Sequence, residues 1–442
     1  MKSNEKKVIE LGYGLKFITI IVLAVFCTSC SSNNNPTSSN NSSNTATLIL
    51  TINSPTVVPS IKVIGKSSTY NISSTDTLKS INAGTYVIEA KRVDISPSGG
   101  DLVGKSFGVF KPVQQITING GDTRTININY SELPASGKLW VSDDNGSKLL
   151  AFDKAVLTSP GSPAASVKIQ FNYEGPRGIA FDKFGNLWVA GFSNNHIYAF
   201  TPGQLSGNVS ASPLITLTDN SISGPNGLIF DASGNLWISN WTSGSIIEYS
   251  SDSLSNLLVK SGSVSAAPDV QITSDKLEKP QYMTFDTYGN LWLAGQDPSS
   301  YKAEIIKFSS SDLVTSGAAA PSVVITESSQ PTLINVTGLA FDKNGNLWGT
   351  DGNSFFRFSA NQLTSSGAVI PQLYRGVSAP ALLIGLAFDS QANLWMGETY
   401  APQLIRYTYP NSGSGTTYTT SSDLNEPTWL VFFPPPSGYN IY

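Results

Sequence analysis

Four carboxylates stand where they could hold a cation or a basic ligand. Asp143, Asp351 and Glu398 each close a short apolar run that contains a tryptophan, and Glu426 comes just before another such run. Carboxylate oxygens are preferred ligands of Ca²⁺, so calcium is the one candidate cofactor that this pattern suggests. The alternative is that each carboxylate caps the loop that carries it, as short acidic side chains commonly do.

Few other residues offer catalytic chemistry. The 442-residue chain has one histidine, His196, and two cysteines. Sites that need two imidazoles are therefore excluded, and a Ser-His-Asp triad could use only His196. Two functions stay open: a non-enzymatic protein that binds a ligand or acts as a scaffold, and a metal-dependent hydrolase or lyase. The scarcity of catalytic groups favours the first.

The charge balance argues against one class of partner. Lysines and arginines number 27 against 31 aspartates and glutamates, and the sequence pI is about 5.2. No basic surplus is available to neutralise a phosphate backbone, so we expect no nucleic acid partner.

The N-terminus has the parts of a secretory signal. Four lysines precede a mainly apolar run from Phe17 to Phe26. Ten residues in a helix span about 15 Å, half of the roughly 30 Å hydrocarbon core of a bilayer. We therefore expect a cleaved signal rather than a membrane-spanning anchor.

The residues after this run resemble a bacterial lipobox, in which a small residue precedes the cysteine that receives lipid. Thr28 and Ser29 fit that pattern, whereas Cys27 stands where leucine is most common. The resemblance implies lipidation at Cys30 and a protein anchored by lipid in the bacterial cell envelope, at the outer membrane or the cell surface. The alternative is an ordinary cleaved secretion signal. In either case Cys27 leaves with the signal, and no disulfide is expected.

Composition divides the chain into four parts. Residues 1–29 are the predicted signal peptide, and residues 30–45 are a Ser/Asn-rich tether with almost no apolar side chain to bury. Residues 46–133 carry short alternating runs with frequent turn residues, which predict a small antiparallel β-sandwich. Residues 137–434 carry internal repeats.

The sandwich region resembles the transthyretin-like or PEGA-like modules of exported bacterial proteins. The resemblance depends on Asn82 to Val87 and on Gly120 to Thr123, which precede its last strand. It implies a spacer that holds the main domain away from the membrane, and the alternative is an adhesive module.

A repeated phrase determines the fold of the remaining chain. It reads Gly-Leu-Ala-Phe-Asp, with small changes, followed shortly by Gly-Asn-Leu-Trp. Copies begin at Gly178, Gly227, Met283, Gly338 and Gly385, and an isolated second half stands at 137–140. The six tryptophans recur every 47 to 56 residues, which is the length of a four-stranded propeller blade with its loops.

Each phrase predicts two strands joined by a tight turn. The aspartate can accept hydrogen bonds from its own turn amides, and the glycine supplies a positive φ. Third and fourth strands follow each copy, so we predict an all-β fold with a six-bladed β-propeller. Residues 137–140 lack an inner strand and the run Pro427–Phe432 lacks a blade, so their pairing would let the C-terminal strand close the ring.

These residues are similar to NHL repeats, and Asn195-His196-Ile197 stands where that family often carries an Asn-His pair. The resemblance covers about residues 137–434 and implies the propeller fold. It leaves function open, because propellers of this kind include binding proteins and enzymes.

Two enzyme families share this kind of ring. Gluconolactonases hold a metal on a glutamate, an asparagine and an aspartate, and Glu174-Gly175-Pro176 and Pro225-Asn226-Gly227 look like two of those motifs. The resemblance stops there, because the motifs fall on adjacent blades and the expected aspartate is missing. Streptogramin lyases depend on a histidine near the channel, whereas His196 begins an outer strand, and we interpret it as structural.

The repeat turns are nearly uniform, which fits a structural role, whereas the opposite face of the ring varies between copies and is where we expect a ligand. The candidate ligand-binding residues are Asp143, Asn226, Asn240, Trp241, Asp351, Glu398 and Glu426. The acidic ones belong to neighbouring blades of the closed ring. Trp241 could stack on a sugar or anchor a peptide, or it could pack on its own blade edge. The expected partners are the membrane, through the lipid, and a protein, peptide or glycan.

Overall fold

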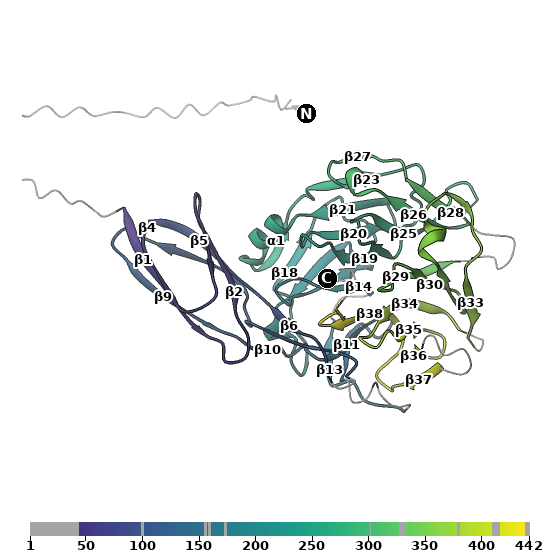
Figure 1. The fold of residues 1–442 in the computed structure, drawn as a ribbon, viewed down its shortest axis with the longest axis horizontal. Helices are drawn as coiled ribbons and strands as arrows, with labels where there is room; N and C mark the ends of the chain where they lie inside the picture. Colours follow the sequence, from purple (N-terminus) through teal and green to yellow (C-terminus); the bar gives the residue numbers. More distant parts are fainter. Residues whose placement is uncertain are drawn as a thin grey trace, which may run out of the picture. The chain divides into compact units, whose positions relative to one another are not determined.

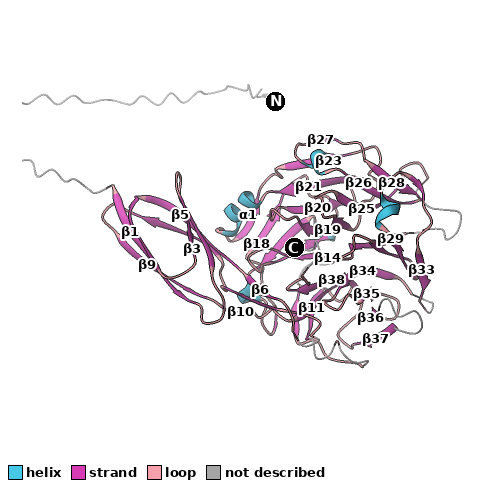
Figure 2. Ribbon diagram, viewed as in Figure 1, coloured by secondary structure: helices cyan, strands magenta, loops and turns pink. Residues whose placement is uncertain are grey.

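The computed structural model describes residues 44–98, 101–153, 157, 161–171, 175–300, 302–326, 333, 335–377, 381–408 and 416–437, which belong to one compact unit. The predicted signal peptide, the predicted lipidation site Cys30, most of the tether and Glu174 lie outside these residues. Within them, no helix has the length and apolarity that a bilayer crossing requires. The predicted all-β class is confirmed (Figures 1 and 2).

The N-terminal region forms two main sheets. The first has the order β4-β1-β9, from β1 (Thr45–Asn53), β4 (Asp76–Asn82) and β9 (Thr123–Asn129). The second has the order β3-β2-β5-β8, from β2 (Ser60–Ile64), β3 (Thr69–Ile72), β5 (Gly84–Lys91) and β8 (Val113–Ile118). Alternate side chains of these strands, including Leu48, Leu50, Ile61, Val63 and Ile88, form one buried cluster, as the alternating sequence predicts.

One pairing in this region differs from the predicted antiparallel arrangement. β1 and β9 run parallel, with Thr47 opposite Thr123 and Asn53 opposite Asn129. Parallel neighbours need a long crossover connection, and the whole second sheet lies between these two strands in the sequence. A short third sheet, with the order β10-β7-β6, follows from β6 (Val93–Ile95), β7 (Lys105–Gly108) and β10 (Ser131–Glu132).

The remaining strands form six sheets, which we number 1 to 6. The innermost strands, in sheet order, are β38 (Pro427–Phe433), β14 (Pro176–Phe181), β19 (Pro225–Phe230), β24 (Met283–Phe285), β29 (Val336–Phe341) and β34 (Leu383–Phe388). The second strands are β11 (Lys138–Asp143), β15 (Leu187–Gly191), β20 (Leu236–Asn240), β25 (Leu291–Gln296), β30 (Leu347–Asp351) and β35 (Leu394–Glu398). The third strands are β12 (Lys148–Asp153), β16 (His196–Phe200), β21 (Ser245–Tyr249), β26 (Ala303–Phe308), β31 (Ser354–Phe358) and β36 (Gln403–Tyr407). The fourth strands are β13 (Val167–Gln170), β18 (Ile215–Thr218), β23 (Val270–Thr273), β28 (Val323–Thr326), β33 (Leu373–Gly376) and β37 (Thr416–Thr420).

The six sheets are arranged around a centre. Each innermost strand contacts the innermost strand of the next sheet, and β34 contacts β38, which in turn contacts β14 (Figure 1). This is the arrangement of a β-propeller, although no single sheet closes on itself. β38 pairs antiparallel with β11, from Lys138 opposite Phe433 to Asp143 opposite Pro427, so the last strand lies in the sheet of the first tryptophan.

Four sheets gain a fifth strand that the sequence does not predict. These strands are β17 (Asn208–Val209), β22 (Gly262–Ser265), β27 (Gly317–Ala318) and β32 (Gly367–Ala368). Each comes from the third-to-fourth-strand connection of the next sheet and pairs parallel with the fourth strand. The same connections carry the short helices η3 (Pro202–Gln204), α1 (Ser251–Leu258), η4 (Ser310–Leu313) and η5 (Ala360–Leu363), and η2 (Phe192–Asn194) follows β15. The added strands cover outer edges that would otherwise expose unpaired backbone groups.

The repeated aspartate organises its own turn. In the third complete copy, Asp286 Oδ1 accepts hydrogen bonds from the backbone N–H groups of Tyr288 and Asn290, at 2.9 and 3.0 Å. Its Oδ2 accepts from Asn290 Nδ2 at 2.8 Å and from Trp292 Nε1 at 3.0 Å. The other four copies repeat the indole bond, from Trp188, Trp237, Trp348 and Trp395. The predicted hydrogen bonds from the turn amides are confirmed. The hydrogen bond from the tryptophan indole was not predicted.

Each repeat tryptophan also packs edge-to-face on a phenylalanine of the next innermost strand. The pairs are Trp140–Phe181, Trp188–Phe230, Trp237–Phe285, Trp292–Phe341, Trp348–Phe388 and Trp395–Phe432. Their ring centroids lie 5.8 to 6.4 Å apart, within the range of favourable aromatic pairs. The last pair joins sheet 6 to sheet 1, so the series runs around the whole ring.

Glycine begins most copies because neighbouring innermost strands come close together there. A Cβ on Gly227 would lie 2.4 Å from the carbonyl oxygen of Gln281, and one on Gly178 would lie 2.6 Å from that of Asn226. Any larger residue would force the strands apart.

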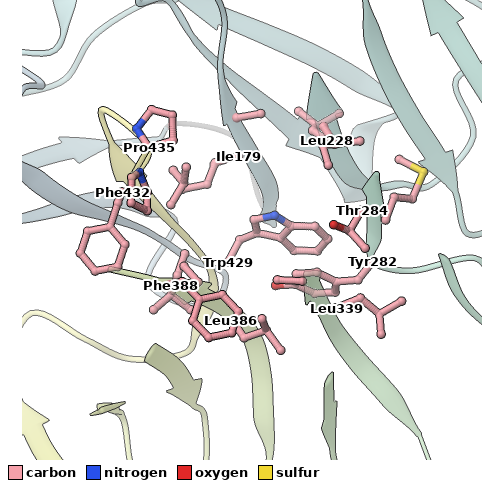
Figure 3. A pocket seen from close by; sticks show the side chains of 18 residues that line it. Ile179, Leu228, Tyr282, Thr284, Leu339, Leu386, Phe388, Trp429, Phe432 and Pro435 are labelled. Atoms are coloured by element: carbon pink, nitrogen blue, oxygen red, sulfur yellow. The ribbon is translucent and has the colours of Figure 1, made fainter. Parts of the chain in front are cut away.

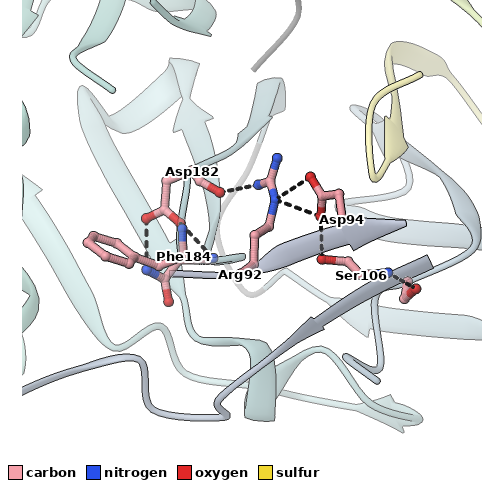
Figure 4. Close-up of polar contacts among 7 residues, drawn as sticks. Arg92, Asp94, Ser106, Asp182 and Phe184 are labelled. Atoms are coloured by element: carbon pink, nitrogen blue, oxygen red, sulfur yellow. Dashed lines mark hydrogen bonds and ion pairs between the residues drawn. The ribbon is translucent and has the colours of Figure 1, made fainter. Parts of the chain in front are cut away.

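Arg92 links the N-terminal sheets to the first repeat turn (Figure 4). Its side chain is 8% exposed and pairs with Asp94, with 3.1 Å between Nε and Oδ2. The guanidinium donates to the carbonyl of Asp182, and the Arg92 backbone N–H donates to the carbonyl of Lys183 at 3.1 Å. The guanidinium also lies 4.9 Å from the ring centroid of Phe433. The N-terminal sheets therefore contact the side of the ring that carries the repeat turns.

The repeat turn gives a test of its backbone requirement. The fifth complete copy has Ala392, at a φ of +64°, where the other four have glycine. A left-handed conformation costs a non-glycine residue about 1–2 kcal/mol, and glycine avoids this cost. Glycine also makes the unfolded chain more flexible, which offsets about 0.5–1 kcal/mol of that stabilisation. We expect Ala392→Gly to raise the free energy of unfolding by about 1 kcal/mol in urea denaturation.

Gly345→Ala is the matched control for this turn. Gly345 has a φ of +76°, and an added Cβ would meet its nearest neighbour at 3.8 Å, so the change introduces no clash. It should destabilise the protein by about 1 kcal/mol. Equal stabilities for both variants and the parent would contradict the left-handed turn.

Candidate functional site

Two aromatic side chains meet at the centre of the ring (Figure 3). Trp429 of β38 and Tyr282, just before β24, come from opposite sheets and stack with 3.3 Å between ring centroids and 12° between planes. The Tyr282 hydroxyl donates to the carbonyl of Thr428 at 2.8 Å. Gly385 gives them room, because a Cβ there would lie 2.3 Å from that hydroxyl. The stack fills the middle of the channel.

Toward the repeat turns the channel narrows to an apolar cavity of about 50 Å³. Its walls include Ile179, Leu228, Leu339, Leu386 and Phe432, from five different sheets (Figure 3). Small-molecule sites usually measure about 300–1,000 Å³ and carry a few converging polar groups. This part of the channel therefore has neither the space nor the polar groups of such a site.

We call the end where the innermost strands begin the mouth face, and the end with the repeat aspartates the turn face. The predicted candidate residues lie at the mouth face, at the ends of β11, β20, β30 and β35 and at the start of β19. The structure separates them into buried residues that stabilise loops and residues that reach solvent.

Asp143 is fully buried and caps the chain before the last strand. Its carboxylate accepts hydrogen bonds from the backbone N–H groups of Gly146, Asn425 and Glu426, at 2.7 to 2.9 Å. The same carboxylate thus fixes its own loop and the segment that leads into β38. Those bonds take three of the four lone pairs that the carboxylate offers, so loop capping accounts for most of its bonding.

Asp351 and Glu398 are also buried and hold loops. Asp351 accepts from the backbone N–H of Asn335 at 2.7 Å and from the hydroxyl of Tyr374 at 3.2 Å. Glu398 accepts from the backbone N–H groups of Tyr400 and Ala401, both at 2.8 Å. These two acids and Asp143 therefore act as loop caps, which is the alternative to ligand binding given in the sequence analysis. Among the residues that the structure describes, no three His, Cys, Asp or Glu side chains form a group that could hold a metal ion.

The two candidate asparagines are both buried. Asn240 is fully buried, and its amide bonds to Ser221, Ser223 and Ser245 at 2.7 to 3.1 Å, so it fixes the loop before β19. Asn226 is mostly buried near the start of β19.

Trp241 is partly exposed and belongs to a row of contacts across the mouth face. Its ring packs edge-to-face on Phe192 at 5.8 Å, and Lys279 Nζ lies 5.3 Å from its centroid. The Arg177 guanidinium lies 3.5 Å from the centroid of Phe192, and Arg177 Nε lies 3.3 Å from Asp144 Oδ2. We call these five residues the mouth row. It joins sheets 1 to 4 and presents two aromatic rings between two cations.

Carboxylates border one end of the mouth row. Burial raises the pKa of Asp144, although the Arg177 guanidinium opposes the shift. Burial, together with the negative charge of Asp144, also raises the pKa of Glu426. Arg177 therefore lies among acids that gain from a nearby positive charge.

Sequence reasoning identified only Trp241 of the mouth row. Phe192 follows β15 directly, as Trp241 follows β20, so an aromatic residue just past a second strand was an available signal. Arg177 and Lys279 carry no comparable signal. Arg177 lies over Phe192 of its own sheet, whereas Lys279 lies over Trp241 of the neighbouring sheet, a position that depends on how the two sheets pack.

His196 begins β16, and its Nδ1 lies 3.3 Å from the hydroxyl of Tyr198 on the same strand. Burial lowers the pKa of His196. The imidazole thus interacts with its own blade, in agreement with a structural interpretation.

No protein-family model and no curated protein matches this sequence. Similar solved structures include a streptogramin B lyase, with 13% identity, a TM-score of 0.43, and 76% of this chain and 87% of that chain covered. A virginiamycin B lyase from Staphylococcus aureus gives 14% identity, a TM-score of 0.42, and coverage of 75% and 88%. A protein of unknown function from Bacteroides caccae gives 10% identity, a TM-score of 0.47, and coverage of 67% and 98%.

The different burial of Trp429 and Trp241 predicts different losses of stability when each is replaced by alanine. We expect Trp429→Ala to lower the free energy of unfolding by about 3–5 kcal/mol, because it removes a buried ring at the centre. Trp241→Ala should cost about 1 kcal/mol or less, because that ring is partly exposed. Urea denaturation followed by far-UV circular dichroism measures both. Similar losses for the two variants would contradict the assigned roles.

Proposed function

We propose that this protein is a non-enzymatic binding propeller, displayed on the bacterial cell envelope, that takes its ligand at the mouth face. In this proposal residues 137–434 form a six-bladed ring closed by the C-terminal strand, and residues 46–133 serve as the spacer. The pairing of β38 with β11 and the cyclic contacts of the innermost strands support the closed ring.

The observation that carries the proposal is the stack of Trp429 on Tyr282. It fills the middle of the channel, where a substrate of a channel enzyme would have to lie. The mouth row presents the partly exposed ring of Trp241 between Phe192 and Lys279. A rigid aromatic surface bordered by charges is suited to a peptide or a glycan, since tryptophan and arginine often dominate binding interfaces.

The contacts of the N-terminal sheets also support a ligand site at the mouth face. They reach the turn face through Arg92 at Lys183 and through Leu102 at Ser390, where the Ser390 backbone N–H donates to the Leu102 carbonyl at 3.0 Å. The mouth face is the opposite end of the ring.

The binding proposal predicts a selective effect of Trp241. The protein, with Cys30→Ser to keep it in solution, should bind members of a glycan or peptide array. Trp241→Ala should weaken that binding at least tenfold while the melting temperature stays within a few degrees, because a partly exposed anchor contributes more to a ligand than to the fold. His196→Ala, at the start of β16, is the matched control and should bind like the parent.

Blank arrays for the parent protein would indicate a purely structural envelope protein instead. A metal-dependent hydrolase or lyase makes a different prediction, because a metal that binds the folded state raises the melting temperature. We expect neither calcium nor EDTA to change that temperature. A shift of several degrees would overturn the non-enzymatic proposal.

Anchoring by lipid has its own test. We expect the full chain, expressed in a bacterium that lipidates proteins, to fractionate with membranes and to incorporate a labelled fatty acid. Cys30→Ser should lose the label and leave the membrane fraction, because the mature chain then carries no acyl group. Cys27→Ser is the control and should keep both. A Cys30→Ser protein that stays in the membrane after signal cleavage would exclude the lipid anchor.

A further inference from the structure

Three sheets place a cation of their own over the repeat tryptophan. On the third strand, the residues directly opposite Trp292, Trp348 and Trp395 are Lys307, Arg357 and Arg406. Their charged groups lie 5.4, 5.4 and 5.6 Å from the indole centroids. These distances are within the range of cation–π attraction.

Sheet 3 carries the opposite charge at this position. Glu248 of β21 is paired with Trp237 of β20. Glu248 is 4% exposed, and within the described part of the chain no residue donates a hydrogen bond to its carboxylate or forms an ion pair with it. Burial, together with the negative charges of Asp269 and Asp231, raises the pKa of Glu248 to about 7. A buried carboxylate without a partner is unfavourable, so a cation from outside would be stabilised here.

Space for such a cation lies beside Glu248. A groove of about 530 Å³ runs between sheets 3 and 4 and is lined by Glu248, Asp231, Trp237, Asp286 and Leu313. Asp231 and Asp286 are the repeat aspartates, whose oxygens already hold their own turns. Both residues still line the groove, so their negative charges lie close to it, and Leu313 supplies an apolar wall.

The next groove provides a natural comparison. It lies between sheets 4 and 5, measures about 420 Å³, and is built from the same positions of the repeat, with Asp286, Trp292, Asp342 and Leu363. Lys307 is part of its lining, where Glu248 is part of the first. The second groove therefore holds a cation of the chain, and the first has a carboxylate in its place.

We propose that the groove between sheets 3 and 4 binds a guanidinium or alkylammonium group, such as a basic side chain of a peptide. Its charge lies against Glu248, and its alkyl stem packs on Trp237 and Leu313. This site is at the turn face and is independent of the mouth row.

Calorimetric titration at pH 8 tests the proposal with three probes of similar size. Nα-acetyl-arginine amide and Nα-acetyl-lysine amide carry the charge, and Nα-acetyl-citrulline amide does not. At least one charged probe should bind ten times more tightly than the citrulline probe. The better of the two identifies the preferred group.

Two substitutions of Glu248 locate the binding. Glu248→Gln keeps the shape and removes the charge, so it should weaken binding of the charged probe at least tenfold. Glu248→Lys gives sheet 3 the arrangement of sheet 4 and should abolish binding while the protein stays folded. Lys307→Gln, in the neighbouring groove, is the matched control and should bind like the parent. Equal binding of the three probes, no binding by the parent, or unchanged binding by Glu248→Gln would overturn the proposal.

Discussion

The ring depends on one interaction that recurs in every complete repeat, the hydrogen bond from the tryptophan indole to the turn aspartate. In the second complete copy, Trp237 Nε1 donates to Asp231 Oδ2 at 3.1 Å, and the same ring packs on Phe285 of the next sheet. One end of the indole is thus fixed within its blade while its edge holds the neighbour. A buried indole N–H needs an acceptor, and the aspartate provides it, so the ring can be buried without an unpaired N–H group.

In the isolated first copy the buried indole N–H has a different acceptor. Trp140 has no turn aspartate, and its Nε1 donates to the backbone carbonyl of Ala135 at 3.1 Å. Its ring packs on Phe181, and Trp395 packs on Phe432 of the last strand. The aromatic series therefore crosses the junction between the two ends of the ring, where sequence-distant segments meet.

Tight contact leaves little space at the centre of the ring. Glycines such as Gly227 and Gly385 let the innermost strands approach, and Trp429 and Tyr282 fill the remaining space. For this reason the two proposed binding sites, the mouth row and the groove beside Glu248, lie away from the centre. Both sites lie between blades, where side chains of one sheet meet rings or charges of the next.

The sequence by itself determined the periodic part of this protein. Spacing and alternation predicted the all-β class, the strands of each repeat and the bonding of the turn aspartates, because these depend on neighbours within a few residues. It also left the capping alternative open for Asp143, Asp351 and Glu398, which the structure finds bonded to loop amides. Only the tertiary structure decided the parallel pairing of β1 with β9, the central stack, the position of Lys279 over Trp241, and the groove that opens beside Glu248. Those features depend on contacts between segments far apart in the chain, and no local pattern records which sheets will pack against each other.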